Sequence, residues 1–149
     1  MNYQHVLLTL DYSEHVNDVL EKGKSIAELN SAKLTLLHVL DNIPMPQIAY
    51  GTEIDLTKPT DDKLLESEKH KFTRLADKLG IQQDCRRLIW GSPKQEIIRI
   101  AEQEQVDLIV VGSHGRHGLA LLLGSTANAI LHHAKCDVMA IRLQDEELI

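Results

Sequence analysis

The chain has 149 residues, of which 43% are hydrophobic and 3% aromatic, and its formal net charge is −6 at pH 7. This length predicts one domain over residues 1–149, which buries roughly 70% of the surface that its unfolded chain exposes. The acidic excess disfavours electrostatic binding of nucleic acid or of an anionic membrane. The apolar run before Asp11 is too short for a membrane span and has no basic lead, and Cys85 and Cys136 form no Cys-x-x-Cys motif. We therefore expect a cytoplasmic protein without a disulfide framework, and neither nucleic acid nor a membrane as its partner.

Apolar runs separated by turn residues predict an alternation of strands and helices. The expected strands span residues 6–10, 33–40, 83–90, 106–111 and 136–143. Four helices are expected between them, and their first or capping residues are Ser13, Asp61 or Asp62, Pro93 and Ser125. Ser92 and Gln95 form a capping box around Pro93, Asn30 and Ser31 end the first helix, and Gly80 ends the second. Residues 41–60 contain three prolines and a glycine, so this segment is expected to be an irregular loop.

This order of elements predicts an α/β fold. We expect a single doubly wound sheet of five mostly parallel strands, with helices on both faces and right-handed crossovers. In such sheets a ligand binds at the carboxyl ends of the strands, where the strand order reverses. Asp11 follows the first strand, Val39 lies near the end of the second, and Gly112 follows the fourth. A carboxylate, an apolar backbone edge and backbone N–H groups would meet there, which suits a nucleotide.

A glycine-rich loop connects the fourth strand to the last helix. Its glycines are Gly112, Gly115, Gly118 and Gly124. They let backbone N–H groups approach an anion closely, and Ser125 then begins a helix whose first N–H groups lack intrahelical partners. His114 and Arg116 add protonatable or positive groups. The loop therefore predicts a phosphate-binding site.

Common catalytic motifs are missing from the sequence. It has no Gly-x-Ser-x-Gly elbow, no P-loop with its lysine and no Gly-x-Gly-x-x-Gly turn after the first strand. Hydrolase, P-loop NTPase and dinucleotide-binding functions are therefore disfavoured. His132 and Cys136 have the i, i+4 spacing of helical metal ligands, and His114, His117 and His133 lie in the same region. No carboxylate cluster accompanies them, so we expect no metal beyond a Mg²⁺ ion carried with a nucleotide.

Four segments in this order resemble the universal stress protein family over nearly the whole chain. They read HVLLTLDYSEH, KLTLLHVL, VDLIVVGSHGR and GSTANAILHHAKCDVMAIR. The resemblance implies a Rossmann-like, adenine nucleotide alpha hydrolase-like fold and a non-catalytic, cytoplasmic stress-response role. It also implies a homodimer that pairs through the edge strand at residues 136–143, where an apolar strand needs a partner.

For the ATP-binding branch of the family, the resemblance implies a site for ATP or AMP. Asp11 would lie near the adenosine, and Val39 would lend its backbone to the adenine. The ribose and phosphate contacts would fall on Gly112, Gly115, Gly124, Ser125 and the adjoining Thr126. That branch has nine residues between its second and third glycines, and this chain has eight between Gly115 and Gly124. In a helical segment one residue fewer rotates the residues after it by about 100° and shifts them by about 1.5 Å, unless Gly118 absorbs the difference.

Two alternatives stay open. The acidic tail, formed by Asp145, Glu146 and Glu147, resembles the universal stress protein A branch, which lacks the glycine loop and is not regarded as ATP-binding. The chain would then be a dimeric protein-interaction module that carries no nucleotide and acts on unknown protein partners. The other alternative is a weak ATPase, for which His114 or Asp11 would have to supply the base.

Overall fold

The computed structural model describes residues 2–10, 16–113 and 124–142, and strands and helices alternate along them. The strands are β1 (His5–Leu10), β2 (Lys33–Leu40), β3 (Arg86–Trp90), β4 (Leu108–Gly112) and β5 (Asp137–Ile141). The longer helices are α1 (Val16–Asn30), α2 (Lys63–Leu79), α3 (Pro93–Gln103) and α4 (Ser125–His133). Two short 3₁₀ helices are η1 (Gln47–Ala49) and η2 (Gln83–Cys85).

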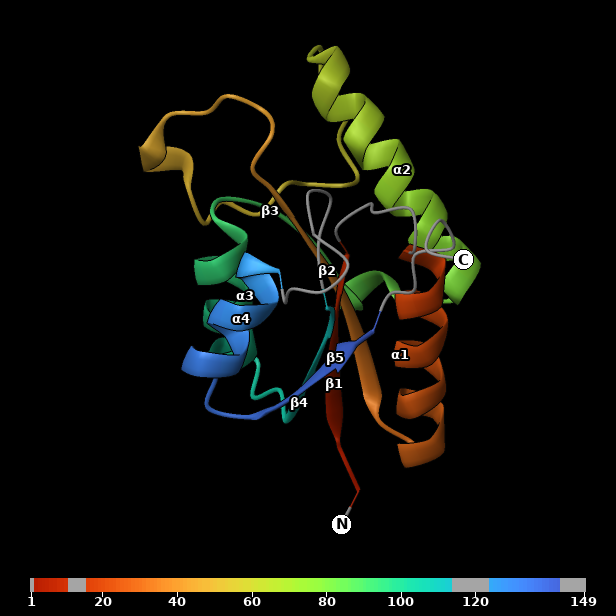
Figure 1. Cartoon of the computed structure of the whole chain (residues 1–149). Coiled ribbons are helices and arrows are strands. Elements are labelled where there is room, and N and C mark those ends of the chain that lie inside the picture. Colours follow the sequence, from red (N-terminus) through yellow and green to blue (C-terminus); the bar gives the residue numbers. More distant parts are fainter. Residues whose placement is uncertain (1, 11–15, 114–123, 143–149) are drawn as a thin grey trace, which may run out of the picture.

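The five strands form one sheet in the order β3-β2-β1-β4-β5, and every neighbouring pair is parallel. The chain starts in the middle of the sheet, extends outward through β2 and β3, and returns to the other side of β1 through β4 and β5. Helices α1 and α2 cover one face and α3 and α4 cover the other (Figure 1). The predicted doubly wound α/β fold is confirmed, and the strand order reverses between β1 and β4.

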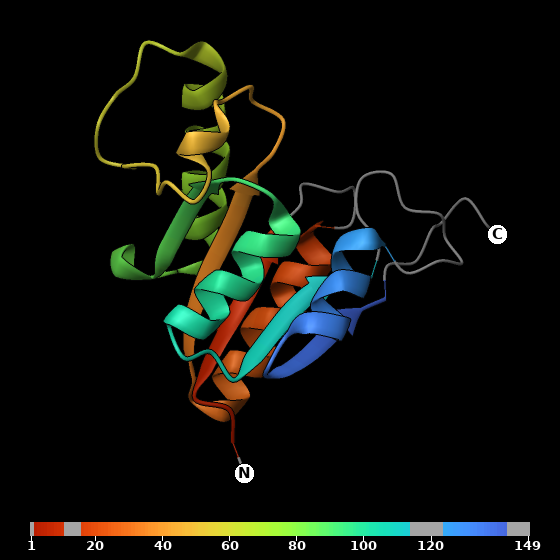
Figure 2. The ribbon, with the colours of Figure 1, turned by 90° about the vertical axis from the view of Figure 1, so that its left-hand side faces the viewer.

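The apolar runs of the central strands supply two core layers, because successive side chains of a strand point to opposite faces. The layer between the sheet and α1 and α2 includes Leu8, Leu36, Leu88 and Val110 of the strands and Phe72 of α2. The layer between the sheet and α3 and α4 includes Leu7, Leu37 and Ile89 of the strands, Ile97 of α3 and Ile130 of α4. Figure 2 looks onto the face that α3 and α4 cover, with the carboxyl ends of the strands toward the top. Burial on both faces explains why these strands show no alternation of polar and apolar residues.

Local signals set several helix ends as predicted. The side chain of Asp62 accepts hydrogen bonds from the N–H groups of Leu64 and Leu65 at the start of α2. Gly80 ends that helix in the left-handed region, with φ of 69°. Ser31 follows α1 with φ of 54°, so the predicted break after Asn30 is confirmed. The expected cap at Ser13 lies outside the described residues.

Other boundaries were predicted wrongly. The third strand begins at Arg86 rather than at residue 83, because the Cys85 N–H donates to the Gln82 carbonyl over 2.9 Å and closes η2. The capping box at Ser92 does not form: its side chain makes no cap hydrogen bond, and its carbonyl accepts the Glu96 N–H at 2.9 Å. The fourth strand is shifted two residues later at its start and includes Gly112, and the fifth is shorter than predicted.

The segment at residues 41–60 is more ordered than the predicted irregular loop. Residues 51–54, which we call the strap, lie antiparallel to β3. The Gly51 N–H donates to the Trp90 carbonyl over 2.6 Å, the Trp90 N–H to the Thr52 carbonyl over 3.1 Å, and the Ile54 N–H to the Leu88 carbonyl over 2.8 Å. Gly51 has φ of 86°, which favours glycine there. The strap therefore covers the outer edge of β3.

Candidate functional site

The strand order reverses at the carboxyl ends of β1 and β4, which is where doubly wound sheets bind ligands. The ladder between β1 and β4 ends at the pair Leu8 and Val110, whereas the ladder between β1 and β2 continues to Leu10 and His38. Beyond Leu8 and Val110 the ladder between β1 and β4 has no further pair, which is where the strand order reverses. We call this region, with the start of α4, the carboxyl edge.

The N-terminus of α4 lies directly past the end of β4. The Gly124 N–H donates to the Ser113 carbonyl over 2.7 Å, and the Ser113 N–H donates to the Ile141 carbonyl at the end of β5 over 2.8 Å. Gly124 is the N-cap of α4, so no side chain caps the first N–H groups of the helix. The first turn also contains no acidic residue. Within the described ranges this helix start therefore presents backbone donors without a side-chain cap, and the positive end of a helix dipole, which favour an anion.

The described positions among the predicted site residues fall at this edge. Gly112 is the last residue of β4, and Ser125 and Thr126 are the first two of α4. Val39 lies one residue past the last pair between β1 and β2 and still pairs with Ile89 of β3. Val39 is 5% exposed as a whole residue and its side chain packs beneath α3 and α4, so its side chain is not a ligand contact. Four further predicted positions, Asp11, His114, Gly115 and Arg116, lie outside the described residues.

Sequence reasoning missed two polar side chains at the carboxyl edge. The Nδ1–H of His38 donates to the Leu10 carbonyl over 2.6 Å, and the Thr9 hydroxyl donates to the Val110 carbonyl over 3.1 Å. No motif surrounds either residue. The available signal was a polar residue inside an otherwise apolar strand, because a buried polar group needs a specific partner.

The amino ends of the strands are satisfied by side chains of the chain itself. The Asp107 carboxylate accepts the N–H groups of Gln4 and His5 over 2.8 and 2.9 Å. Partial burial, the largest single influence, raises the pKa of Asp107, but the hydrogen bonds from backbone N–H groups, these two among them, together with the nearby His5 hold that pKa below its ordinary value. The Nδ1–H of buried His5 donates to the Glu104 carbonyl at 3.1 Å, so its Nε2 accepts from the Thr35 hydroxyl at 2.7 Å. Burial lowers the pKa of His5.

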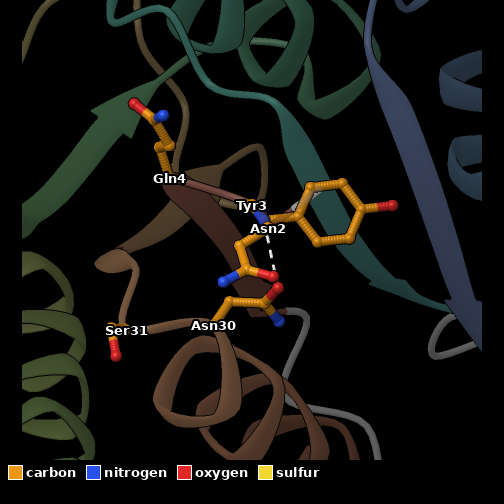
Figure 3. A pocket seen from close by; sticks show the side chains of 5 residues that line it. All are labelled: Asn2, Tyr3, Gln4, Asn30 and Ser31. Atoms are coloured by element: carbon orange, nitrogen blue, oxygen red, sulfur yellow. Dashed lines mark hydrogen bonds between the residues drawn. The ribbon is translucent and has the colours of Figure 1, made fainter.

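A hollow of about 620 Å³ opens beside these strand ends, and Figure 3 shows the residues that line it, Asn2, Tyr3, Gln4, Asn30 and Ser31. The Asn30 side chain accepts the Tyr3 N–H over 3.0 Å and donates to the Ile26 carbonyl over 2.7 Å. The Tyr3 hydroxyl donates to the Asp137 carboxylate over 2.8 Å, which raises the pKa of Tyr3. The Asn30 amide and the Tyr3 hydroxyl thus bind other parts of the chain, which makes the hollow a weaker ligand site than the carboxyl edge.

The histidines and the cysteine near the last helix are disfavoured as metal ligands by the sequence. Among them, no group of three His, Cys, Asp or Glu side chains is placed to hold a metal ion. Helix α4 ends at His133, so Cys136 is not helical and does not share a helix face with His132. His114 and His117 lie outside the described ranges. Within those ranges no helix is both long and apolar enough to cross a membrane.

The fold and this edge define an α/β protein of the Rossmann-like class, with its candidate site where the strand order reverses. The Universal stress protein family matches the chain over residues 2–142. The chain belongs to this family, as its four sequence segments predicted.

Relatives and solved structures agree with this assignment. Universal stress protein A homologs 1 and 2 of Coxiella burnetii are 37% and 39% identical to this chain. The alignments cover 97% and 96% of the chain and 100% and 97% of those proteins. The structure of hypothetical protein MJ0577 is 26% identical, has a TM-score of 0.76, and is matched over 98% of this chain and 100% of that one. A universal stress protein in complex with cAMP, 19% identical, shares the fold with a TM-score of 0.67 over 95% of this chain and 98% of that one.

Proposed function

We propose that this universal stress protein binds an adenine nucleotide, ATP or AMP, at the carboxyl edge and acts in the cytoplasm as a non-catalytic stress-response protein. The observation that carries the proposal is the glycine-capped N-terminus of α4, which the hydrogen bond from Gly124 to Ser113 holds at the end of β4. A solved protein of the same fold was crystallised with cAMP, which supports an adenine nucleotide as the ligand class. The residues assigned to the site are Asp11, Val39, Gly112, His114, Gly115, Arg116, Gly124, Ser125 and Thr126.

Each part of this edge suits one part of a nucleotide. The first N–H groups of α4 would bind phosphate, because they have no side-chain cap. The backbone past the last pair between β1 and β2, at Val39, would face the adenine. The Asp11 carboxylate would accept hydrogen bonds from ribose hydroxyls. Together these contacts favour a nucleotide over inorganic phosphate.

The first experiment asks whether the purified protein carries or binds a nucleotide. The small molecules released on denaturation are identified by mass spectrometry, and ATP, AMP and adenosine are then titrated into the emptied protein by calorimetry. We expect saturable binding of ATP or AMP and much weaker binding of adenosine, because the phosphate contacts are lost. Absence of bound nucleotide, with no heat up to millimolar ATP or AMP, would overturn the proposal in favour of the protein-interaction module.

Gly124→Asp locates the site on α4. Gly124 has φ of −61° and ψ of 154°, an extended backbone that any residue adopts, so the substitution introduces no backbone strain. The new carboxylate would cap the helix and repel phosphate, so we expect affinity for ATP and AMP to fall at least tenfold. Gly124→Ala is the matched control, because it adds a Cβ without an acceptor and leaves the N–H groups uncapped. Equal affinity in wild type and Gly124→Asp would place the ligand elsewhere.

The same variants separate binding from turnover. Phosphate release from ATP is measured under conditions in which the protein is saturated, and we expect none above the rate of the buffer. Release that is present in the wild type and lost in Gly124→Asp would favour the weak ATPase, because a contaminating enzyme would not respond to this substitution.

We also propose that two copies pair through β5, as the resemblance implies. β5 is an edge strand of the sheet, and Val138, Met139 and Ala140 on it are half-buried. Val138→Asp is the test, with the sedimentation coefficient as the measurement, and we expect the dimer to dissociate into monomers. Ile141→Asp would not serve, because Ile141 is 6% exposed within the core and its substitution would unfold the chain. A dimer unchanged by Val138→Asp would overturn this pairing.

A further inference from the structure

Two side-chain hydrogen bonds hold the carboxyl end of β1, one toward each neighbouring strand. On the β2 side, the Nδ1–H of His38 donates to the Leu10 carbonyl over 2.6 Å. On the β4 side, the Thr9 hydroxyl donates to the Val110 carbonyl over 3.1 Å. Each bond falls at the last residue pair of its ladder, which is Leu10 with His38 toward β2 and Leu8 with Val110 toward β4. Both ladders of β1 are therefore reinforced at the positions where they stop.

The two side chains act from opposite faces of the sheet. His38 is 7% exposed and stands between Leu36 and Leu40, which pack beneath α1 and α2. Thr9 is two residues from Leu7, which packs beneath α3 and α4, so it points to that face. His38 thus stabilises the end of β1 from the face covered by α1 and α2, and Thr9 from the face covered by α3 and α4. Both lie next to the point where the ladder between β1 and β4 ends.

We propose that Thr9 and His38 are positioning residues, which order the carboxyl edge before a ligand arrives and so determine its affinity for nucleotide. This inference rests on the proposed function. Strand ends open locally at low cost, and a side-chain hydrogen bond at the last pair of a ladder opposes that opening. If the carboxyl edge is ordered before binding, the ligand does not have to pay the entropic cost of ordering it, and its affinity is higher. The two bonds act through the carbonyls of Leu10 and Val110, which precede the predicted ligand positions Asp11 and Gly112 by one and two residues.

Matched threonine substitutions at the two ends of the sheet test Thr9. Thr9→Val keeps the shape of the side chain and removes the hydroxyl, and we expect ATP and AMP to bind about three- to tenfold more weakly. Thr9→Ser keeps the hydroxyl and should restore most of the affinity. Thr35→Val removes the hydroxyl that His5 contacts at the amino ends of the strands, so it should lower thermal stability without changing nucleotide affinity.

A second pair of variants tests His38 in the same way. His38→Leu removes the donor to the Leu10 carbonyl, and His38→Asn offers an amide N–H at the position of Nδ1. We expect weaker nucleotide binding in His38→Leu and recovery in His38→Asn. A purely structural role predicts instead that affinity follows thermal stability across all variants, including Thr35→Val. Wild-type affinity in both Thr9→Val and His38→Leu would overturn the inference while leaving the proposed function intact.

Amide hydrogen exchange of the unliganded protein tests the ordering without any nucleotide. We expect Thr9→Val and His38→Leu to speed exchange in residues 108–112 and in the first turn of α4, with exchange in α2 unchanged. If the wild type binds neither ATP nor AMP, the proposed function fails and this measurement alone decides whether the two side chains order the edge. Exchange as slow as in the wild type would then overturn the inference.

Discussion

The two ends of the sheet treat their unpaired backbone groups in opposite ways. At the amino ends of the strands, the Asp107 carboxylate takes two backbone N–H groups and His5 bridges a carbonyl and a hydroxyl. At the carboxyl edge, the N-cap of α4 is Gly124, which has no side chain to offer to the helix. Polar side chains are present there, at Thr9 and His38, but both donate to strand carbonyls and neither of them caps the helix.

Under the proposed function, this difference separates an end of the sheet that stabilises the fold from an end that binds the ligand. Where the chain satisfies its own strand and helix ends, a ligand has few groups to bind and removing a side chain costs stability. Where backbone donors are left uncapped, stability is given up for the ability to bind an anion. Substitutions at the amino end should therefore change the free energy of unfolding, and substitutions at the carboxyl edge should change ligand affinity.

The largest expected effect on stability is at Asp107. Asp107→Ala removes the acceptor for the N–H groups of Gln4 and His5, so we expect the free energy of unfolding to fall by about 2 kcal/mol. Urea denaturation measures the loss. Asp107→Asn keeps one neutral acceptor and should lose about half as much. If Asp107→Ala is as stable as the wild type, or if it weakens nucleotide binding as strongly as Gly124→Asp, the contrast between the two ends fails.

A smaller effect is expected from the titration of His5. Because burial lowers the pKa of His5 in the folded protein, the unfolded chain takes up a proton first as the pH falls through about 6.5. The contribution of His5 to stability is therefore complete above that pH and is lost progressively below it. Unfolding free energies of wild type and His5→Gln are compared between pH 5 and pH 7.5, and their difference should shrink with acidification.

The control for this titration is His70, whose side chain is 81% exposed on α2. His70→Gln makes the same exchange at an exposed position, and we expect it to keep the wild-type dependence on pH because it leaves the buried His5 in place. If His5→Gln shows the same slope as the wild type, the acid sensitivity belongs to other groups.

The smallest expected effect is a gain. Gly124→Asp supplies the cap that α4 lacks, so the unliganded protein should become more stable by a few tenths of a kcal/mol, about the difference between Gly and Asp at an N-cap. Thermal unfolding of unliganded Gly124→Asp and Gly124→Ala measures it. A loss of stability in Gly124→Asp would mean that the first turn of α4 has another partner in the unliganded protein.

Strands and helix ends with local causes could be predicted from the sequence. Asp62 and Gly80 act on residues beside them in the chain, so their roles follow from residue type and position. The turn at Gln82 also has a local cause, the hydrogen bond from the Cys85 N–H to the Gln82 carbonyl. It lies directly before the apolar residues of β3, and the apolar pattern alone assigned η2 to that strand. The predicted capping box at Ser92 was wrong, because serine and glutamine at these positions allow the two side-chain hydrogen bonds of a capping box but do not require them.

The strap and the missed site residues have causes that are distant in the chain. Gly51 pairs with Trp90, and Thr9 donates to Val110, so both contacts depend on the strand order and register of the finished sheet. The candidate site was located because a rule about strand ends applies to any doubly wound sheet. The side chains that hold that edge could be found only once the register was known.

The strap also limits how many molecules can be joined through the sheet. A parallel sheet has two edges, and a chain with both available can add neighbours on either side without end, as fibres do. Residues 51–54 occupy the edge at β3, so the edge at β5 is the one that remains. In the proposed contact, β5 of one copy pairs with β5 of the other. In the proposed dimer, growth by strand addition would therefore stop at two copies, and loss of the strap's hydrogen bonds would remove that limit.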